Sequence, residues 1–344
     1  MFPYLIAIVI SATLLYFLTN VAHNISLVDK PDHRKHHLQL TPLTGGISIA
    51  LAFGMSSLFL PIQLGNYRIF FFSLITIVLI GALDDHRDIS PKIKILFQFA
   101  VATLLVFVDN KVVLFIGDIL FSGHSQGLGI IAAPFTIIAI VGVINAFNMI
   151  DGLDGLAGGI ALITLGAFIL LLHLQPGVTH TLPLLYLLAT VTTVFLVFNL
   201  EFLVVRNRQV FLGDAGSMFL GLVCVYFLID FTRPGDEVIN VTSAAWIIGF
   251  PLLDMMSVML LRIIKGQSPL KADRLHIHHL LLDLGFGKYT VLVMLLCLHL
   301  IFTLIGLLGT LNHWPDGILF WGMFVVLALY VGLNIKIHTQ ISSG

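Results

Sequence analysis

Acidic and amide side chains recur at regular intervals in the segment NAFNMIDGLDGLAGG, residues 145–159. Asn145, Asn148, Asp151 and Asp154 follow one another at intervals of three residues. On a helix this spacing places neighbours on one face, and the glycines that follow permit tight turns and close backbone approach. Oxygen ligands of this kind suit a hard divalent cation. The segment predicts a cradle for a metal and phosphates, with a polar loop of helix caps as the alternative.

Two further acidic clusters stand where apolar segments begin or end. Asp84 and Asp85 are adjacent in GALDDHRDISPK, residues 81–92, and Asp214 stands between glycines in QVFLGDAGSMFLG, residues 209–221. Adjacent carboxylates repel each other unless a cation lies between them, so the pair could bind Mg²⁺ or act as a base. Asp214 could hold a metal against a phosphate or simply cap a helix. A solvated helix end remains the alternative for the pair.

A fourth cluster is the cationic loop SPLKADRLHIHHLLLDLGFGK, residues 268–288. Its cationic or metal-binding side chains are Lys271, Arg274, His276, His278 and His279. Neighbouring histidines could bind zinc, but no cysteine stands nearby. Cationic donors are better suited to a phosphate or diphosphate. A loop that meets anionic lipid headgroups is the alternative.

Two other polar features have less specific interpretations. Asp254 lies inside an apolar segment, where a carboxylate is costly and must face the interior of a helix bundle. We interpret it as structural, paired with a buried arginine or with polar backbone. The segment 29–46 carries Lys30, Arg34 and Lys35, which could clamp an anionic lipid head or anchor the chain at the membrane surface.

The composition indicates which elements must position these residues. Of the 344 residues, 58% are hydrophobic and 10% are charged, against about 25% charged in a soluble domain. The chain has no basic stripe typical of nucleic-acid binding. Cys224 and Cys297 lie in apolar runs and predict neither a disulfide nor a zinc site. The first apolar run lacks the basic region and cleavage site of a secretory signal, which predicts a retained first span.

We therefore predict an all-α, polytopic membrane helix bundle that forms one integral membrane domain over residues 1–344. A membrane helix needs about 20 mostly apolar residues. Segments that meet this requirement lie at 2–21, 45–62, 67–83, 93–109, 130–147, 155–174, 182–200, 213–231, 241–263, 289–310 and 316–336. No internal repeat is evident.

The distribution of lysine and arginine supports this count of eleven spans. Of the 17 Lys and Arg residues, all but Arg68, Lys111 and Arg233 lie in or beside one set of alternating linkers. The positive-inside rule makes that set cytoplasmic, with the N-terminus outside and the C-terminus inside. The cytoplasmic loops that would form the active site are 23–44, 84–92, 148–154, 201–212 and 264–288. On the other side, the alternating segment 110–129 predicts a small external hairpin.

An acidic, amide-rich site that faces a cationic loop is the equipment of phosphoryl transfer assisted by Mg²⁺. Its position at the membrane surface implies one lipid substrate and one water-soluble substrate. The residues by themselves identify neither the sugar nor the nucleotide.

The motifs DDHRDISPK, NAFNMIDGLDGLAGG, VFLGDAGS, PLLD and SPLKADRLHIHH resemble those of the polyprenyl-phosphate N-acetylhexosamine-1-phosphate transferases of the glycosyltransferase 4 type. They are most similar to the WecA-type branch. The resemblance implies transfer of N-acetylglucosamine-1-phosphate from UDP-N-acetylglucosamine to undecaprenyl phosphate, with release of UMP. It also implies a bacterial inner membrane, a place at the start of O-antigen or common-antigen synthesis, Mg²⁺ with Mn²⁺ as a substitute, and inhibition by tunicamycin-type nucleosides. A homodimer is compatible with it.

The resemblance also assigns roles to individual residues. Asn148 and Asp214 match metal ligands, and Asp84 matches the carboxylate that deprotonates the lipid phosphate, with Asp85 as its metal-adjacent neighbour. Asp151 matches a further catalytic acid. The remaining matches bind substrate. The uridine pocket would contain Asp154, Asn199 and Phe211, and the diphosphate or sugar side would contain Arg274, His276, His278 and His279.

Three alternatives remain open. The peptidoglycan branch, phospho-MurNAc-pentapeptide translocase, is disfavoured because the loop reads His-Ile-His-His rather than three consecutive histidines. Another UDP-N-acetylhexosamine could be the donor. A secondary transporter, from a different class, would place its site at the bilayer midplane within repeats. For the chemistry, direct attack by the lipid phosphate is preferred to a two-step route through an aspartyl-phosphate.

Overall fold

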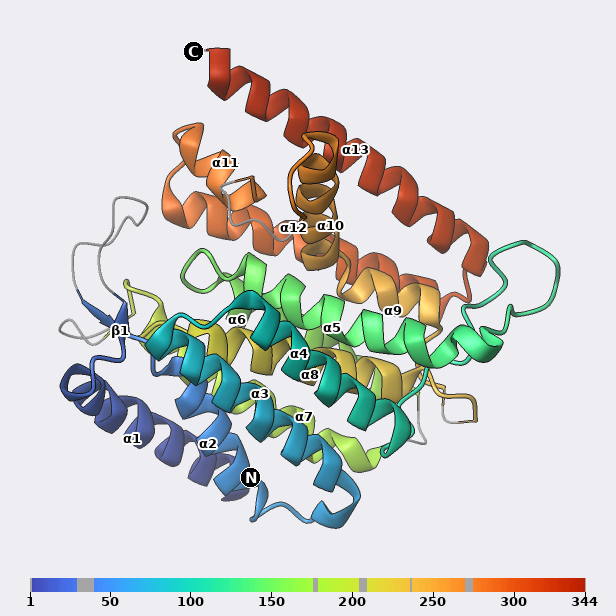
Figure 1. Cartoon of the computed structure of the whole chain (residues 1–344). Helices are drawn as coiled ribbons and strands as arrows, with labels where there is room; N and C mark the ends of the chain where they lie inside the picture. The colour runs from blue at the N-terminus through green and yellow to red at the C-terminus, as the bar shows by residue number, and fades with distance from the viewer. Residues whose placement is uncertain are drawn as a thin grey trace.

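The computed structural model describes residues 2–29, 40–175, 179–203, 209–235, 237–269 and 275–343. Within these ranges the protein is an all-α helix bundle, and the only sheet is a pair of two-residue strands. Figure 1 shows most of the helices packed side by side along one general direction, with α10 running across them and α13 on the outside. The predicted fold class, an all-α polytopic membrane protein, is confirmed.

The helices follow the chain in this order: α1 Phe2–Asn24, α2 Gly45–Ser57, α3 Arg68–Arg87, α4 Pro91–Phe107, α5 Ala132–Ile150, α6 Leu156–Leu174, α7 Leu182–Asn199, α8 Gly213–Phe231, α9 Val241–Ile247, α10 Gly249–Ile264, α11 Ile277–Asp283, α12 Lys288–Leu311 and α13 Asp316–Ser343. Strands β1 Val28–Asp29 and β2 Thr41–Pro42 pair antiparallel. Short 3₁₀ turns occupy Leu64–Tyr67, Gly129–Ile131 and Thr179–Thr181.

Every one of the eleven predicted segments is helical. Within the described residues, eight helices are long and apolar enough to cross a membrane, and α9 with α10 would make a ninth as a broken span. Two predicted spans are shorter than expected. Helix α2 has 13 residues and α4 has 17, whereas a 30 Å hydrocarbon core needs about 20. The number of complete crossings and the sidedness of the termini stay predictions.

The predicted span 241–263 is not one straight helix. It breaks at Ile248 into α9 and α10, whose axes differ by 79°. Pro251 stands in the first turn of α10. Because proline lacks the N–H that continues a helical hydrogen-bond ladder, it favours a bend at this position. The break redirects α10 toward the loop that contains the histidines.

Helix α8 forms the centre of the bundle. Nearly all of its residues are buried, and α2, α3, α5 and α6 pack around it. The outer helices expose large apolar side chains such as Phe72, Ile75 and Leu79. A helix satisfies its own backbone hydrogen bonds, so these exposed faces suit contact with lipid.

Small residues bring α2 and α3 close to the start of α8. A Cβ atom on Gly46 would clash with the backbone of Gly216, and one on Gly81 would clash with the backbone of Ala215. Such contacts between small residues let membrane helices approach closely. They place the end of α3, which carries Asp84 and Asp85, directly beside Asp214.

Substituting Gly81 by valine is expected to separate α3 from α8. Because the added side chain meets backbone rather than a flexible side chain, the expected loss of stability is about 2 kcal/mol or more. Thermal unfolding of the purified protein in detergent measures this loss. Gly54→Val is the matched control, since the space around Gly54 on α2 is open. Equal unfolding temperatures for the two variants would contradict the packing described.

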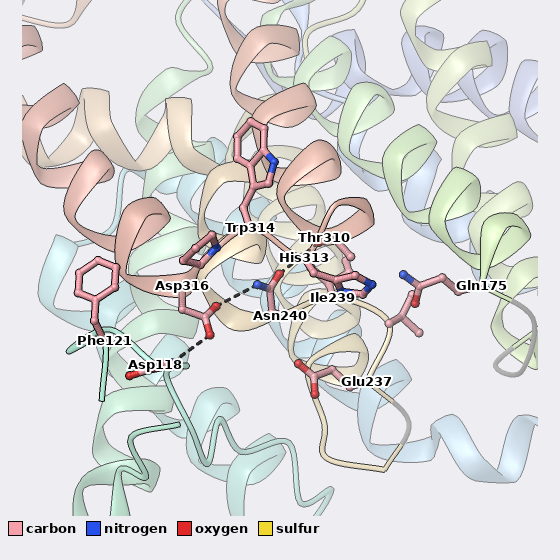
Figure 2. Close-up of a pocket in the computed structure, with 12 residues that line it drawn as sticks. Asp118, Phe121, Gln175, Glu237, Ile239, Asn240, Thr310, His313, Trp314 and Asp316 are labelled. Carbon is pink, nitrogen blue, oxygen red and sulfur yellow. Dashed lines mark hydrogen bonds between the residues drawn. The ribbon is translucent and has the colours of Figure 1, made fainter. Parts of the chain in front are cut away.

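The segment 110–129 joins α4 to α5 at the end of the bundle where α13 begins (Figure 1). The predicted hairpin takes the form of a loop with one antiparallel bridge between Phe115 and Gly127. Asp316, at the start of α13, accepts hydrogen bonds from the Asp118 amide at 2.9 Å and from the Asn240 side chain at 2.9 Å. Figure 2 shows these contacts beside a pocket of about 510 Å³.

Two of the three exceptions to the charge asymmetry lie together near that opposite end. Lys111 forms an ion pair with Asp230 and lies 4.6 Å from the ring centroid of Tyr226. Arg233 lies 3.8 Å from the same Asp230 carboxylate. Because Asp230 neutralises part of their charge, Lys111 and Arg233 are weaker evidence against the predicted orientation than unpaired cations would be.

Candidate active site

Two carboxylates from distant parts of the chain meet around one lysine. The Lys94 ammonium lies 2.7 Å from Asp84 Oδ2 and 2.8 Å from Asp214 Oδ2. The three residues come from α4, α3 and α8, and the Asp84 side chain is only 11% exposed. A hydrogen-bonded ion pair this sheltered is stronger than a surface pair. The arrangement brings two carboxylates together between α3 and α8, with Lys94 as the cation that they share.

Asp85 has a different environment from its neighbour. Its Oδ1 accepts the backbone N–H of Asp214 at 2.8 Å, and its Oδ2 accepts that of Ala215 at 3.2 Å. Gly213 has φ +70° and lies so close that a Cβ atom would meet the Asp85 carboxylate. Asp85 therefore joins the end of α3 to the first turn of α8 and so fixes the position of Asp214.

Asn148 reaches the same cluster from α5. Its side-chain amide donates to Ser217 Oγ at 3.0 Å and approaches the Asp214 carboxylate. The structure thus brings Asp84, Asn148 and Asp214 together, although they are separated by more than 60 residues in sequence. Three helices supply one oxygen-rich site.

Asp151 and Asp154 follow α5 in the turn that leads to α6. Burial raises the pKa of the Asp151 carboxyl well above its usual range, and nearby acidic charges, Asp214 foremost, raise it further. A carboxyl in this setting takes up a proton unless a cation compensates its charge. The turn ends at Gly155, whose φ of +83° raises the conformational free energy of any residue that has a Cβ atom.

The residues of this cluster fit a divalent cation. Among the described residues, no three acidic, histidine or cysteine side chains already surround a metal position. However, Asp84, Asp214 and the Asn148 amide offer the hard oxygen ligands that Mg²⁺ prefers. Asp84 Oδ1 is buried and has no hydrogen-bond partner in the structure. An unpaired buried oxygen is costly, and a bound cation would satisfy it.

The histidine motif lies against the Asp151 turn. Gly152 is so close to the His278 ring that a Cβ atom would clash with its Nε2. The His276 and His278 rings stack with centroids 5.8 Å apart, and the His278 and His279 centroids are 4.1 Å apart. The predicted meeting of the cationic loop with the acidic cluster is therefore present. Arg274 lies outside the described residues.

The predicted uridine residues gather around the segment 209–211. Asn199 is 3% exposed; its Oδ1 accepts the Gly155 N–H at 2.6 Å and its Nδ2 donates to the Val210 carbonyl at 2.9 Å. Gln209 donates to Asp154 Oδ2 at 2.9 Å. Asn199 thus ties the two loops together, and direct contact with a nucleotide stays a prediction for it.

Phe211 is anchored through its backbone. Its N–H donates to the Pro42 carbonyl at 2.8 Å, and its carbonyl accepts the Gly45 N–H at 3.0 Å. The segment 209–211 is therefore held between strand β2 and helix α2. The Phe211 side chain is half-buried.

Sequence reasoning missed the two lysines that neutralise these carboxylates. Lys94 joins Asp84 and Asp214, and Lys288 forms an ion pair with Asp154. Both stand at the start of long apolar segments. A lysine at the edge of an apolar run is usually read as a membrane anchor. The signal that could have found Lys94 is its place one residue inside the predicted span 93–109, where a charge suggests function.

The chain is similar to known proteins over most of its length. A family model described as glycosyl transferase family 4 matches residues 67–232. A protein of Yersinia pestis named undecaprenyl-phosphate alpha-N-acetylglucosaminyl 1-phosphate transferase is 34% identical over 95% of this chain and 88% of its own length. Proteins of the same name from Escherichia coli K12 and Haemophilus influenzae are 35% and 34% identical, over 94% and 90% of this chain and 87% of their own lengths. The chain therefore belongs to glycosyl transferase family 4.

Proposed function

We propose that this protein transfers N-acetylglucosamine-1-phosphate from UDP-N-acetylglucosamine to undecaprenyl phosphate and releases UMP. The observation that carries the proposal is the meeting of Asp84, Asn148 and Asp214 around a cation site beside the histidine motif. The names of the relatives supply the acceptor and the transferred group, and UDP-N-acetylglucosamine as the donor is what the family resemblance implies. The reaction would start a lipid-linked glycan such as an O-antigen or common antigen.

Asp84, Asp214 and Asn148 are the residues that would hold Mg²⁺, with Mn²⁺ as a substitute. The ion would neutralise negative charge on the donor diphosphate. Lys94 supplies a further positive charge beside this site, through its contacts with Asp84 and Asp214. Asp85 keeps Asp214 in place through its two backbone contacts.

The proposed reaction is a direct displacement at phosphorus. An oxygen of the lipid phosphate forms a bond to the sugar-bearing phosphorus, and the bond between that phosphorus and the bridging oxygen of UMP breaks. Asp84 would accept the proton of a protonated lipid phosphate. Asp151 supports the acidic cluster, and the cationic and imidazole groups of the loop hold the diphosphate. These loop residues are Arg274, His276, His278 and His279.

The nucleotide would lie over the segment 209–211, near Asp154, with Phe211 stacked on the uracil ring. Phe211→Leu is expected to raise KM for UDP-N-acetylglucosamine about 10-fold with a small change in kcat, because stacking contributes to ground-state binding. Steady-state kinetics of UMP release measures both constants. Phe72→Leu, on the lipid-exposed face of α3, is the control. A large loss in kcat with unchanged KM would contradict the role of Phe211.

The clustered ends of α3, α4, α6, α8 and α12 would face the cytoplasm of a bacterium, where nucleotide sugars are made, with the protein embedded in the inner membrane. At this end α3 is followed by α4 and α5 by α6, and Asn199 at the end of α7 contacts Gly155 and Val210 (Figure 1). The charge asymmetry supports the same orientation.

The test is UMP release by the purified protein supplied with undecaprenyl phosphate, Mg²⁺ and a choice of donors. UDP-N-acetylglucosamine should be used far better than UDP-MurNAc-pentapeptide, and tunicamycin should inhibit. Preference for the pentapeptide donor would support the peptidoglycan branch instead. Substrate flux into sealed vesicles without UMP release would support a transporter. A burst of UMP in the absence of lipid acceptor would favour an aspartyl-phosphate intermediate.

A further inference from the structure

A buried carboxylate on α10, that of Asp254, holds the histidine motif through hydrogen bonds. Asp254 is 1% exposed. Its Oδ2 lies 2.7 Å from His276 Nδ1, and its Oδ1 accepts the Ile277 backbone N–H at 3.1 Å. The sequence predicted an arginine or polar backbone as its partner. The backbone partner is present, but the paired side chain is a histidine of the cationic loop.

The last helix of the bundle completes this contact. The Tyr330 hydroxyl on α13 donates to Asp254 Oδ1 at 3.0 Å, and Tyr330 is itself buried. Asp254 therefore receives hydrogen bonds from three different groups, two on the histidine motif and one on α13. Three donors on one buried carboxylate keep it ionised and fixed in orientation.

Helix α10 also holds the other flank of the loop. Arg262 is buried and donates to the Pro269 carbonyl at 2.6 Å. The two described flanks of residues 270–274 are thus both attached to α10, at Arg262 and at Asp254. The bend at Ile248 sets the direction of this helix.

The contact with Asp254 decides which nitrogen of His276 carries the proton. A carboxylate oxygen only accepts, so Nδ1 must be the donor. The hydrogen bond at Nδ1 thereby determines whether the other ring nitrogen, Nε2, can donate or accept a hydrogen bond. The His276 ring then stacks on His278, and the His278 ring lies against Gly152, beside Asp151. A continuous series of contacts therefore links Tyr330 to the acidic cluster, through Asp254, His276 and His278.

We propose that Asp254 and Tyr330 are positioning residues: they fix the proton of His276 on Nδ1 and hold the stacked His276 and His278 rings against the Asp151 turn. They touch neither substrate nor metal and act through His276. The kinetic part of this inference rests on the proposed function, because it needs a reaction in which the histidine motif participates. The structural part, that Asp254 and Tyr330 hold the histidine rings in position, does not rest on the proposed function.

The kinetic test is a double-mutant cycle on UMP release. Asp254→Asn should lower kcat/KM about 10- to 100-fold, since the amide can present its NH₂ to Nδ1 and invert the tautomer. Tyr330→Phe should lower it about 3- to 10-fold. In a His276→Ala background, Asp254→Asn should have no further effect, within about 2-fold. Independent losses that multiply would show that Asp254 does not act through His276.

Ser257→Ala is the matched control. Ser257 lies one turn after Asp254 and accepts a hydrogen bond from Asn334 at 2.9 Å, one turn after Tyr330. The substitution therefore breaks a buried contact between the same two helices without touching the histidine motif. Its kcat/KM should stay within about 2-fold of the wild type. A loss as large as that of Asp254→Asn would show that helix packing alone explains both effects.

Hydrogen exchange tests the inference independently of activity. In Asp254→Asn, amides of α11, residues 277–283, should exchange about 10-fold faster or more, and in Ser257→Ala they should not change. Unchanged protection of α11 in both Asp254→Asn and Tyr330→Phe would overturn the proposal, whatever the enzyme does. If the wild type released no UMP while α11 responded as expected, the proposed function would fail and the positioning role would stand.

Discussion

Asp214→Asn is expected to lower UMP release by about 1,000-fold or more. The Asp214 carboxylate meets Lys94, the Asn148 amide and the cation site at one point. An asparagine has nearly the same shape but no charge, so it removes the electrostatic contribution and leaves the packing. A loss of this size corresponds to about 4 kcal/mol of transition-state stabilisation. Initial rates at saturating Mg²⁺ measure it.

Asp84→Asn should be impaired to a similar extent, because Asp84 shares Lys94 with Asp214. Asp88→Asn is the matched control. Asp88 ends the same helix, is exposed and has φ +50°, a conformation that asparagine also adopts readily. It should retain nearly full activity. Wild-type turnover in Asp214→Asn or Asp84→Asn would refute the assigned roles.

Lys94→Met is expected to lower kcat/KM by about 100-fold or more. The substitution keeps an unbranched side chain that is one atom shorter and removes the only described cation that bridges Asp84 and Asp214. Without it the two carboxylates repel each other, and the positive charge that faces the donor phosphates is lost. UMP release at several Mg²⁺ concentrations measures the effect.

The control for Lys94 is Lys92→Met, two residues earlier and exposed. It removes an equal charge from the same turn without touching either carboxylate, so its activity should stay within about 2-fold of the wild type. Equal losses in the two variants would show that general positive charge at this membrane surface, rather than the bridge, supports the reaction.

The positions of the helices could be predicted from the sequence because lipid imposes a simple rule. Any long segment in the bilayer must satisfy its own backbone, so apolar length alone located all eleven helical segments. The break at Ile248 was missed because Pro251 stands inside an uninterrupted apolar run. Helix α11 was missed because its seven residues lie in a loop defined by charge. Strands β1 and β2 have two residues each, too few for any periodicity to show.

The site could be predicted only in part. Spacing and residue type pointed to Asp84, Asn148, Asp214 and the histidines, and the structure places them at one end of the bundle. The specific partners could not be predicted, because they depend on packing between helices far apart in sequence. Lys94 reaches Asp214 across 120 residues, and Asp254 reaches Tyr330 across 76. No pattern within a short stretch of sequence indicates which residues meet across such separations.

Asp85 illustrates the same limit at a single residue. By residue type and spacing alone, Asp84 and Asp85 are equivalent members of one acidic pair, and only the family resemblance gives them different roles. In the structure, Asp84 has an unpaired buried oxygen and a lysine partner, whereas both oxygens of Asp85 bind the backbone of α8. Their difference arises because successive residues on a helix point about 100° apart, so only one of them faces the cation site.

Binding of Mn²⁺ followed by electron paramagnetic resonance tests most directly whether Asp84, Asn148 and Asp214 hold one divalent ion. We expect one Mn²⁺ site per chain, displaced by Mg²⁺, retained in Asp88→Asn and weakened at least about 10-fold in Asp214→Asn and Asp84→Asn. Undiminished Mn²⁺ binding in both of these variants, with the fold intact, would contradict this expectation.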